Sequence, residues 1–358
     1  MSARSISSAF PFESKFVHVN GVRMHYVEQG AGQPIVFIHG LPVHSYVWRN
    51  VLPHVAKVGR CIAIDLYGFG KSDQPTQPVD YRTHADMVAG VINALGLTKI
   101  ILVVMDWGSP MGFQYAHDHP DNVRGIAFWE ALVRPITPTT AEASTRALFK
   151  VLKTSVGGHL LVQRANILLN ILLGQLVSRK LSAEEKAAYH APFATYNSRY
   201  AMRAVVGALP VDGFPKAAHD SMQAYSDWLC TTTDLPKLML VASKPLVGKP
   251  QFVAWTAEHF PNLKVVELEG AHFLQENAPD KVSAVIIEWI GTIPPMRASA
   301  PTLEPLEQPD PEPMSFDQTL HVGKSSHPYR KSGRALTVAS SRAEPSHLGL
   351  GKRAKHSK

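Results

Sequence analysis

Short apolar runs alternate with longer amphipathic stretches through the first 130 residues of the chain. Residues Lys15–Val19 and Val22–Val27 flank Asn20-Gly21, which predicts a β-hairpin with a tight turn. Further apolar runs predict buried strands at Pro34–Ile38, Cys61–Asp65, Lys99–Met105 and Val123–Trp129, and helices are expected between them at Asp86–Leu95 and Gly108–His117. This alternation predicts a parallel sheet covered on both faces.

The alternation stops between residues 135 and 215, where no strand is apparent. Helices are expected there at Ala143–Leu152, His159–Leu173 and Ser182–Ala188. The sequence from Ser182 to Glu185 resembles a capping box at the start of the third helix. Strand and helix signals then return at Leu238–Val241, Gln251–His259, Leu263–Leu268 and Asp280–Trp289. We therefore predict an α/β core formed by residues 12–134 and 216–292, interrupted by a helical cap at residues 135–215.

The composition changes sharply after Trp289-Ile290. The sequence becomes rich in proline and acidic residues as far as Asp317, and then rich in Ser, His, Lys and Arg. We predict that residues 293–358 form a disordered appendage. Residues 294–358 carry 10 Lys and Arg against 6 Asp and Glu, so of the net charge of +7 only +3 remains on the rest of the chain. A nearly neutral body gives no reason to expect a nucleic-acid partner.

The 358 residues are 45% hydrophobic and 18% charged, which excludes a collagen, a disulfide scaffold and a wholly disordered chain. No apolar run reaches the roughly 18 residues that span a bilayer, so no membrane partner is expected. The N-terminus has an early Arg4 but no apolar segment typical of a signal peptide. The only cysteines, Cys61 and Cys230, are expected to be buried free thiols in a reducing compartment. We expect a cytoplasmic monomer.

Residues suited to catalysis follow the predicted strands in chain order. Asp106-Trp107-Gly108-Ser109 follows one strand, Glu130 ends the next, and Gly270-Ala271-His272-Phe273 follows the last. A nucleophile on a sharp turn between strand and helix, followed by an acid and a histidine, is the order found in α/β-hydrolases. His39-Gly40-Leu41-Pro42 follows an earlier strand, and His39 is expected to support that loop. The remaining histidines lack the spacing of metal ligands, so neither a metal site nor a cofactor is expected.

From residue 12 to residue 290 the sequence resembles the haloalkane dehalogenases whose catalytic acid follows the sixth strand. The resemblance rests on Ser45–Asn50, Asp65–Asp73, Asp106–Ser109, Glu130 with Arg134-Pro135, Tyr189–Phe193 and Gly270–Glu276. It implies an α/β-hydrolase fold with a mostly parallel eight-stranded sheet and a helical lid. It further implies that Asp106 is the nucleophile, His272 the base and Glu130 the acid that orients it. By the same resemblance, the backbone N–H groups of Leu41 and Trp107 form the oxyanion hole, and the Trp107 indole binds the halide.

The chemistry of the substrate gives an independent reason for an aspartate nucleophile. A halogen-bearing sp³ carbon has no carbonyl to polarise, so it needs a nucleophile that is already anionic, and a carboxylate meets this need at neutral pH. Displacement of the halide makes an ester of Asp106. His272 can then activate water to hydrolyse that ester, while Glu130 fixes the tautomer of the imidazole. The expected partners are a small apolar halogenated substrate, water and halide.

Leu41 departs from the family pattern. At this position the family usually carries a second side chain, most often Asn, that donates a hydrogen bond to the halide. Leucine has no side-chain donor, and losing a hydrogen bond to a charged partner costs about 1.5–3 kcal/mol. We expect a slow enzyme or a shifted substrate range. Asn166 and Asn170 in the insertion, or a water molecule, are possible substitutes.

An apolar pocket is expected to receive the substrate, and any of its candidate residues could equally be ordinary core. The candidates are Phe149, Ile167, Leu168, Leu172, Leu209, Leu246 and Phe273.

Three alternative functions stay open. An epoxide hydrolase would use the same Asp and His together with lid tyrosines, here Tyr189, Tyr196 or Tyr200. A non-catalytic binder of apolar ligands and a luciferase-like oxygenase on the same scaffold are the other two.

Overall fold

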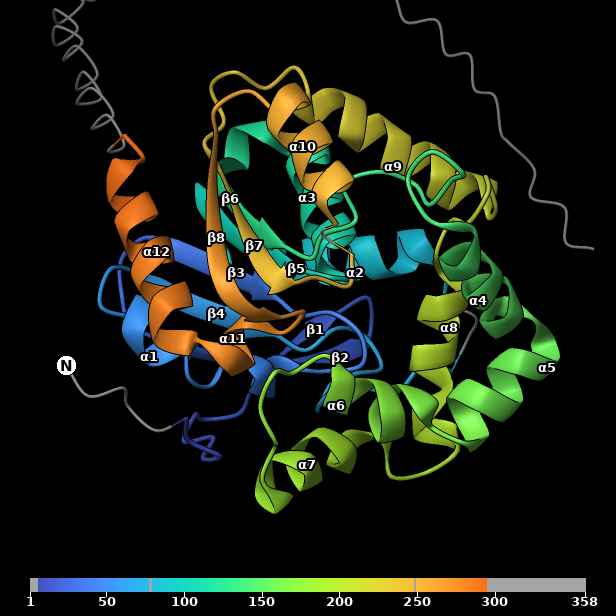
Figure 1. The fold of residues 1–358 in the computed structure, drawn as a ribbon. Helices are drawn as coiled ribbons and strands as arrows, with labels where there is room; N and C mark the ends of the chain where they lie inside the picture. Colours follow the sequence, from blue (N-terminus) through green and yellow to red (C-terminus); the bar gives the residue numbers. More distant parts are fainter. Residues whose placement is uncertain (1–5, 77–78, 248, 295–358) are drawn as a thin grey trace, which may run out of the picture. The chain divides into compact units, whose positions relative to one another are not determined.

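The computed structural model describes residues 6–76, 79–247 and 249–294. Its centre is one eight-stranded sheet with the strand order β1-β2-β4-β3-β5-β6-β7-β8 (Figure 1). The strands are β1 (Lys15–Val19), β2 (Val22–Gln29), β3 (Pro34–Ile38), β4 (Arg60–Ile64), β5 (Ile100–Met105), β6 (Val123–Trp129), β7 (Lys237–Lys244) and β8 (Leu263–Ala271). Strand β2 is antiparallel to β1 and β4, and all other pairs are parallel. The predicted fold class is confirmed.

Helices cover both faces of the sheet. Helices α1 (Leu52–Val55) and α12 (Pro279–Thr292) pack together on one face, and α2 (Tyr81–Ala94), α3 (Gly108–Asp118) and α9 (Lys216–Leu229) pack together on the other (Figure 1). Helix α10 (Pro250–His259) connects β7 to β8, and the short α11 (Leu274–Asn277) follows β8. The central strands β3 and β5 are apolar and almost completely buried, as expected of strands covered on both sides.

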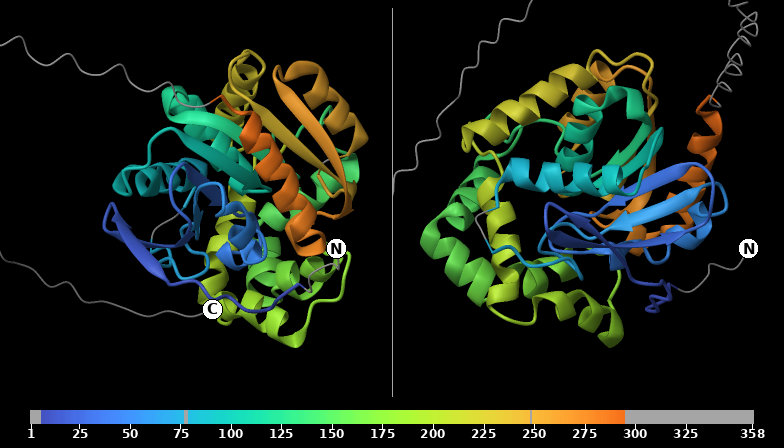
Figure 2. Two further views of the ribbon diagram at one scale, coloured as in Figure 1. Left: turned by 90° about the vertical axis from the view of Figure 1, so that its left-hand side faces the viewer. Right: turned by 180° about the vertical axis from the view of Figure 1, so that it is seen from behind.

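The insertion, which we define as residues 135–215, consists of helices and turns, with isolated β-bridges joining Ile136 to Val211 and Val211 to Phe214. In the two views of Figure 2 it gathers on one side of the sheet as an arc running from green to yellow. Its α-helices are α4 (Ala143–Lys153), α5 (Ser155–Gly157), α6 (Leu173–Gln175), α7 (Ala183–His190) and α8 (Tyr200–Ala208). Two π-helical segments, η3 (Gly158–Arg164) and η4 (Leu168–Leu172), lie between α5 and α6. Short 3₁₀ helices occur within the insertion at η5 (Ala191–Phe193) and η6 (Asn197–Arg199), and within the core at η1 (Ser45–Trp48) and η2 (Pro120–Asn122).

Two of the sequence-based helix predictions need correction. The helix expected at Asp86–Leu95 begins five residues earlier, at Tyr81, because the Asp80 carboxylate accepts a hydrogen bond from the Thr83 N–H (2.8 Å) and caps the helix there. The helix expected at His159–Leu173 is broken and bends by 55°, with Asn166 in the left-handed region (φ 49°) at the bend. Helices α8 and α9 had not been predicted.

Other predictions agree with the structure. The hairpin turns at Asn20 and Gly21, both with positive φ, so that Val19 pairs with Val22. Ser182 and Glu185 form the capping box that begins α7. Within the described residues no single helix is long and apolar enough to cross a membrane, while the bent pair Ser155–Arg164 and Leu168–Gln175 passes that test by length and composition only. Disorder was predicted for residues 293–358. The prediction is wrong for Ile293, which is buried at the end of α12, and residues 295–358 lie outside the described part of the chain.

Candidate active site

The three predicted catalytic side chains meet at the carboxyl ends of neighbouring strands. Asp106 follows β5, Glu130 follows β6, and His272 follows β8. Asp106 and Glu130 both have positive φ (45° and 47°), a conformation that costs a non-glycine residue energy and is common at functional sites. The sheet thus brings together residues that are separated by up to 166 positions in the sequence.

The sharp turn at Asp106 depends on two glycines that allow the backbones to approach. A Cβ atom on Gly108 would lie 2.4 Å from the Ile38 carbonyl oxygen, and one on Gly40 would lie 2.4 Å from Oδ1 of Asp106. Any side chain at either position would push the β3 loop away from the turn. Ser109, whose role was not predicted, adds a bridge: its hydroxyl donates to the Asp106 carbonyl oxygen (2.6 Å) and accepts from the Leu132 N–H (2.9 Å).

The two oxygens of the Asp106 carboxylate have different surroundings. Oδ1 accepts a hydrogen bond from the Leu41 backbone N–H (2.6 Å), and the Trp107 backbone N–H also hydrogen-bonds the carboxylate. Oδ2 lies 3.6 Å from Nε2 of His272. Burial raises the pKa of Asp106 above its usual value, against the opposing effects of His272 and the two N–H groups. The Asp106 side chain keeps 18% of its surface accessible, so a small molecule can reach a carboxylate that is otherwise enclosed.

Glu130 holds the imidazole of His272 in one orientation. Its Oε2 accepts from Nδ1 of His272 (2.8 Å) and from the backbone N–H groups of Leu246 and Val247 (2.8 Å each). Burial opposes ionisation of Glu130, but these donors together lower its pKa. Because a carboxylate can only accept, Nδ1 carries the proton, and Nε2 of the neutral ring points its lone pair towards Asp106.

The charge of Glu130 also controls the titration of His272. Burial lowers the pKa of His272, but the hydrogen bond and charge of Glu130, together with Asp106, outweigh burial and raise it above 6.5. A base must be neutral to accept a proton, so we expect activity to rise with pH through a midpoint above 6.5.

In Glu130→Gln the negative charge is lost. The rise of kcat with pH should then have its midpoint at lower pH, and the value of kcat at high pH should fall. Profiles of halide release between pH 5 and 9 provide the measurement, and an unmoved midpoint would show that Glu130 does not set the pKa of His272.

The Trp107 indole, predicted to bind the halide, lies in the buried core directly after Asp106 in the chain. Its ring is buried and packs edge-on against Tyr81 and His84, with centroid separations of 6.1 Å each. Nε1 is buried, and among the described residues it has no hydrogen-bond partner. A buried N–H without a protein partner next to the nucleophile is available to a ligand.

The candidates for a second halide donor are not brought to this site by any described contact. The Leu41 side chain is half-buried and apolar. Asn170 is exposed and donates to the Ala165 carbonyl oxygen (2.9 Å). Asn166 is buried at the bend of the insertion, where its Oδ1 has no partner among the described residues.

The predicted pocket residues differ widely in exposure. Leu168, Leu209 and Phe273 are buried, and the Phe273 ring contacts His272 (4.8 Å between centroids). Phe149, Ile167 and Leu172 are half-buried. Leu246 is 54% exposed, so its side chain does not form a wall of a buried pocket. Its backbone N–H instead donates a hydrogen bond to Glu130.

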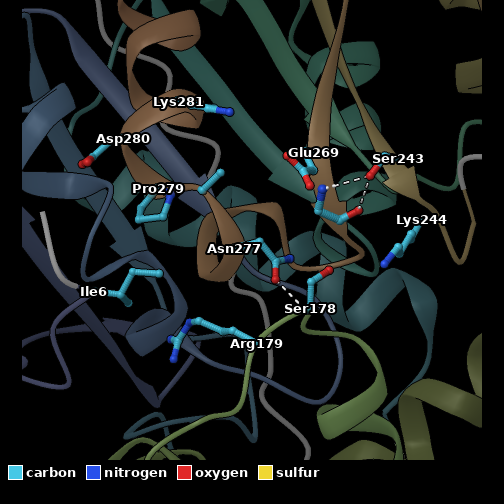
Figure 3. A pocket seen from close by; sticks show the side chains of 12 residues that line it. Ile6, Ser178, Arg179, Ser243, Lys244, Glu269, Asn277, Pro279, Asp280 and Lys281 are labelled. Atoms are coloured by element: carbon cyan, nitrogen blue, oxygen red, sulfur yellow. Dashed lines mark hydrogen bonds between the residues drawn. The ribbon is translucent and has the colours of Figure 1, made fainter. Parts of the chain in front are cut away.

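A cavity of about 480 Å³ beside the end of β8 is lined by none of the predicted site residues. It is lined by Ser178 and Arg179 of the insertion, the end of β7, and the segment from Asn277 to Lys281 (Figure 3). Among the described residues, no group of three His, Cys, Asp or Glu side chains is arranged to hold a metal ion. Cys61 is buried and unpaired as predicted, whereas Cys230 is unpaired but only half-buried.

Comparisons with known proteins identify the family of this chain. Residues 33–279 match the family model described as alpha/beta hydrolase fold. A haloalkane dehalogenase of Sphingobium indicum is 36% identical over 296 residues, covering 80% of this chain and 98% of the relative. One of Mesorhizobium japonicum is 34% identical, covering 75% and 87%.

Solved structures give the same result. The crystal structure of the haloalkane dehalogenase DatA from Agrobacterium tumefaciens C58 superposes with a TM-score of 0.74 at 31% identity, covering 79% of this chain and 97% of that one. That of DbeA from Bradyrhizobium elkanii superposes with a TM-score of 0.74 at 34% identity, covering 79% and 98%.

Proposed function

The chain belongs to the haloalkane dehalogenase family of α/β hydrolases, and from this premise we propose that it hydrolyses haloalkanes through a covalent ester at Asp106. The observation that carries this proposal is the asymmetry of the Asp106 carboxylate. Oδ1 is held by the Leu41 N–H (2.6 Å), whereas Oδ2 lies 3.6 Å from Nε2 of His272, in a side chain that keeps 18% of its surface accessible. Oδ2 is therefore the oxygen that attacks the halogen-bearing carbon, and the halide leaves with the electron pair of the broken bond.

In the proposed ester the carbonyl oxygen would lie where the Leu41 N–H already points. Once Oδ2 is alkylated, Oδ1 becomes the carbonyl oxygen, and the N–H groups of Leu41 and Trp107 stabilise the negative charge that forms when water attacks. Nε2 of His272 takes the proton of that water and returns it to the alkoxide as the bond from the acyl carbon to Oδ2 breaks. Alcohol leaves with Oδ2, and Asp106 keeps the oxygen of the water.

This oxygen exchange provides the test. One turnover of the enzyme in excess over 1,2-dibromoethane in ¹⁸O-water should place the isotope in the peptide containing Asp106, while the first alcohol formed contains ¹⁶O. If product forms and the isotope is found in the alcohol alone, water attacks the substrate directly and the covalent proposal is wrong.

Halide binding is expected to be the weak point of this enzyme, because Trp107 is the one predicted side-chain donor. In Leu41→Asn the backbone N–H that holds Asp106 is kept and an amide donor is added beside it. A hydrogen bond to the leaving halide of about 1.5–3 kcal/mol would raise the rate of dehalogenation about tenfold or more. Bromide release from short bromoalkanes measures the effect, with Leu41→Met as the apolar control. A Leu41→Asn variant no faster than the wild type on any haloalkane would refute the argument.

Epoxide hydrolysis uses the same nucleophile but needs hydroxyl donors for the leaving alkoxide. The Tyr189 hydroxyl donates to the buried Glu276 carboxylate, and the Tyr196 hydroxyl hydrogen-bonds His159 (2.6 Å). Arg203 lies over the Tyr200 ring (5.1 Å). These contacts support dehalogenation over the epoxide alternative, because two of the three candidate hydroxyls have partners elsewhere. We also infer a cytoplasmic location, which the unpaired Cys61 and Cys230 support and which cell fractionation can test. We further infer a monomer, which gel filtration can test.

A further inference from the structure

Three hydrogen bonds that involve backbone groups join the insertion to the segment that carries the proposed base. The Phe273 N–H donates to the Leu176 carbonyl oxygen (3.0 Å), and the Ser178 N–H donates to Oδ1 of Asn277 (2.6 Å, dashed in Figure 3). Nε of Arg179 donates to the Glu276 carbonyl oxygen (2.7 Å). We call residues 176–179 and 273–277, with these bonds, the seam.

The seam brackets His272 closely. Nδ2 of Asn277 donates to the carbonyl oxygens of Phe273 (2.8 Å) and Ala271 (3.4 Å), the two neighbours of His272 in the chain. A shift of the insertion at Ser178 would therefore be transmitted through Asn277 to the backbone on both sides of the imidazole. Glu130 fixes the ring from one side, but it does not fix this backbone.

A buried cluster of four charges anchors the seam. Arg179 bonds the carboxylates of Glu185 (2.6 Å) and Glu276 (2.5 Å), and Arg49 of the core reaches the same two carboxylates. The Tyr189 hydroxyl also donates to Glu276. The side chains of Arg49, Glu185 and Glu276 are almost completely buried, so two positive and two negative groups compensate each other away from water.

Within this charged cluster, Arg179 connects the insertion to the helix that follows His272. Its guanidinium contacts both carboxylates and, through Nε, the backbone of Glu276 in the helix that follows His272. It is also the most accessible of the four, with 25% of its side chain exposed, so it can be replaced with the least disruption. Charge-assisted, bidentate bonds of this kind restrict geometry as well as adding stability.

We infer that Arg179 is a positioning residue for His272, which it keeps in place to activate the hydrolytic water. This inference rests on the proposed function, because it uses the two-step chemistry at Asp106. His272 is needed to hydrolyse the ester, whereas attack by Oδ2 on the halide-bearing carbon needs no base. Loss of Arg179 should therefore slow the second step and leave the first nearly unchanged.

The test compares Arg179→Gln with Arg146→Gln. Arg146 is a matched control, because it is also a partly exposed arginine of the insertion (20%), and it pairs with Asp212 (3.0 Å) rather than with the seam. In Arg179→Gln we expect a rapid burst of one bromide per active site, a hydrolysis rate reduced about tenfold to a hundredfold, and accumulation of alkylated Asp106 in the intact mass. Wild type and Arg146→Gln should show neither the slow phase nor the accumulated ester.

A second variant covers the case in which Arg179→Gln does not fold. Arg179→Lys keeps the positive charge among the carboxylates but cannot make all the bonds of the guanidinium, so it should remain folded and still accumulate ester, to a smaller extent. Thermal unfolding monitored in parallel identifies the folded fraction. Equal slowing of both steps, or no change in either, would overturn the inference. Absence of any alkylated Asp106 in the wild type, in His272→Gln and in the seam variants alike would instead overturn the proposed function.

Discussion

Replacing Asp106 with asparagine is expected to reduce halide release by about 10⁴-fold or more, the scale at which removal of a nucleophile acts in other covalent enzymes. The amide has nearly the same shape as the carboxylate but lacks the negative charge that attacks the sp³ carbon. Asparagine also tolerates the left-handed backbone at this position (φ 45°), so the folded state should be retained. Bromide release from 1,2-dibromoethane at neutral pH measures the loss.

The control for this variant is Asp86→Asn. Asp86 is a half-exposed carboxylate on α2 that pairs with Arg82 (2.8 Å), and its replacement should leave the rate unchanged. Because the ester cannot form in Asp106→Asn, no burst of bromide should precede the steady state. If Asp106→Asn releases bromide at a rate comparable with the wild type, Asp106 is not the nucleophile.

Replacing His272 with glutamine is expected to separate the two steps completely. Attack by Asp106 does not require the imidazole, so one bromide per enzyme should be released and the enzyme should stop as the alkyl ester. Loss of the general base should lower turnover by about 10²–10⁴-fold. Intact mass after exposure to 1-bromobutane should show one added alkyl group, located on the peptide that contains Asp106.

A suitable comparison is His117→Gln. His117 is a partly exposed histidine that also contacts a carboxylate, Asp118 (2.9 Å), but lies at the end of α3 away from the nucleophile. This variant should turn over normally and carry no label. If His272→Gln shows neither a burst nor an alkylated peptide, the imidazole acts before or during halide displacement, and the division of the reaction into two steps is wrong.

That Asp106, Glu130 and His272 meet could be predicted because their positions follow from local sequence patterns. Asp106 and His272 each come directly after a strand, and parallel strands end at one edge of a sheet. The presence of Gly108 indicated a sharp turn, and the structure supplies the reason, since a side chain there would collide with the Ile38 carbonyl oxygen. The hairpin at Asn20-Gly21 and the capping box at Ser182 were predicted equally well, because in both cases the interacting groups are only a few residues apart.

The insertion was harder to predict because its structure depends on contacts that are distant in sequence. The helix expected at His159–Leu173 has continuous helical periodicity, yet it bends at Asn166. Helix α8 was missed, although it packs against η3 and α4 within the insertion. Amphipathic helices of this kind obtain their stability from the surfaces they bury, and those surfaces are known only once the neighbouring helices are in place.

By itself the sequence determined the alternation of strands and helices, the order of nucleophile, acid and base along the chain, and the absence of a side-chain donor at Leu41. These features are set by residue identity and short-range pattern. The tertiary structure alone decided which Asp106 oxygen the Leu41 N–H holds, which N–H groups fix Glu130, and how Arg179 joins the insertion to the helix after His272. Such properties depend on distances between atoms far apart in the chain, which residue types and spacing do not specify.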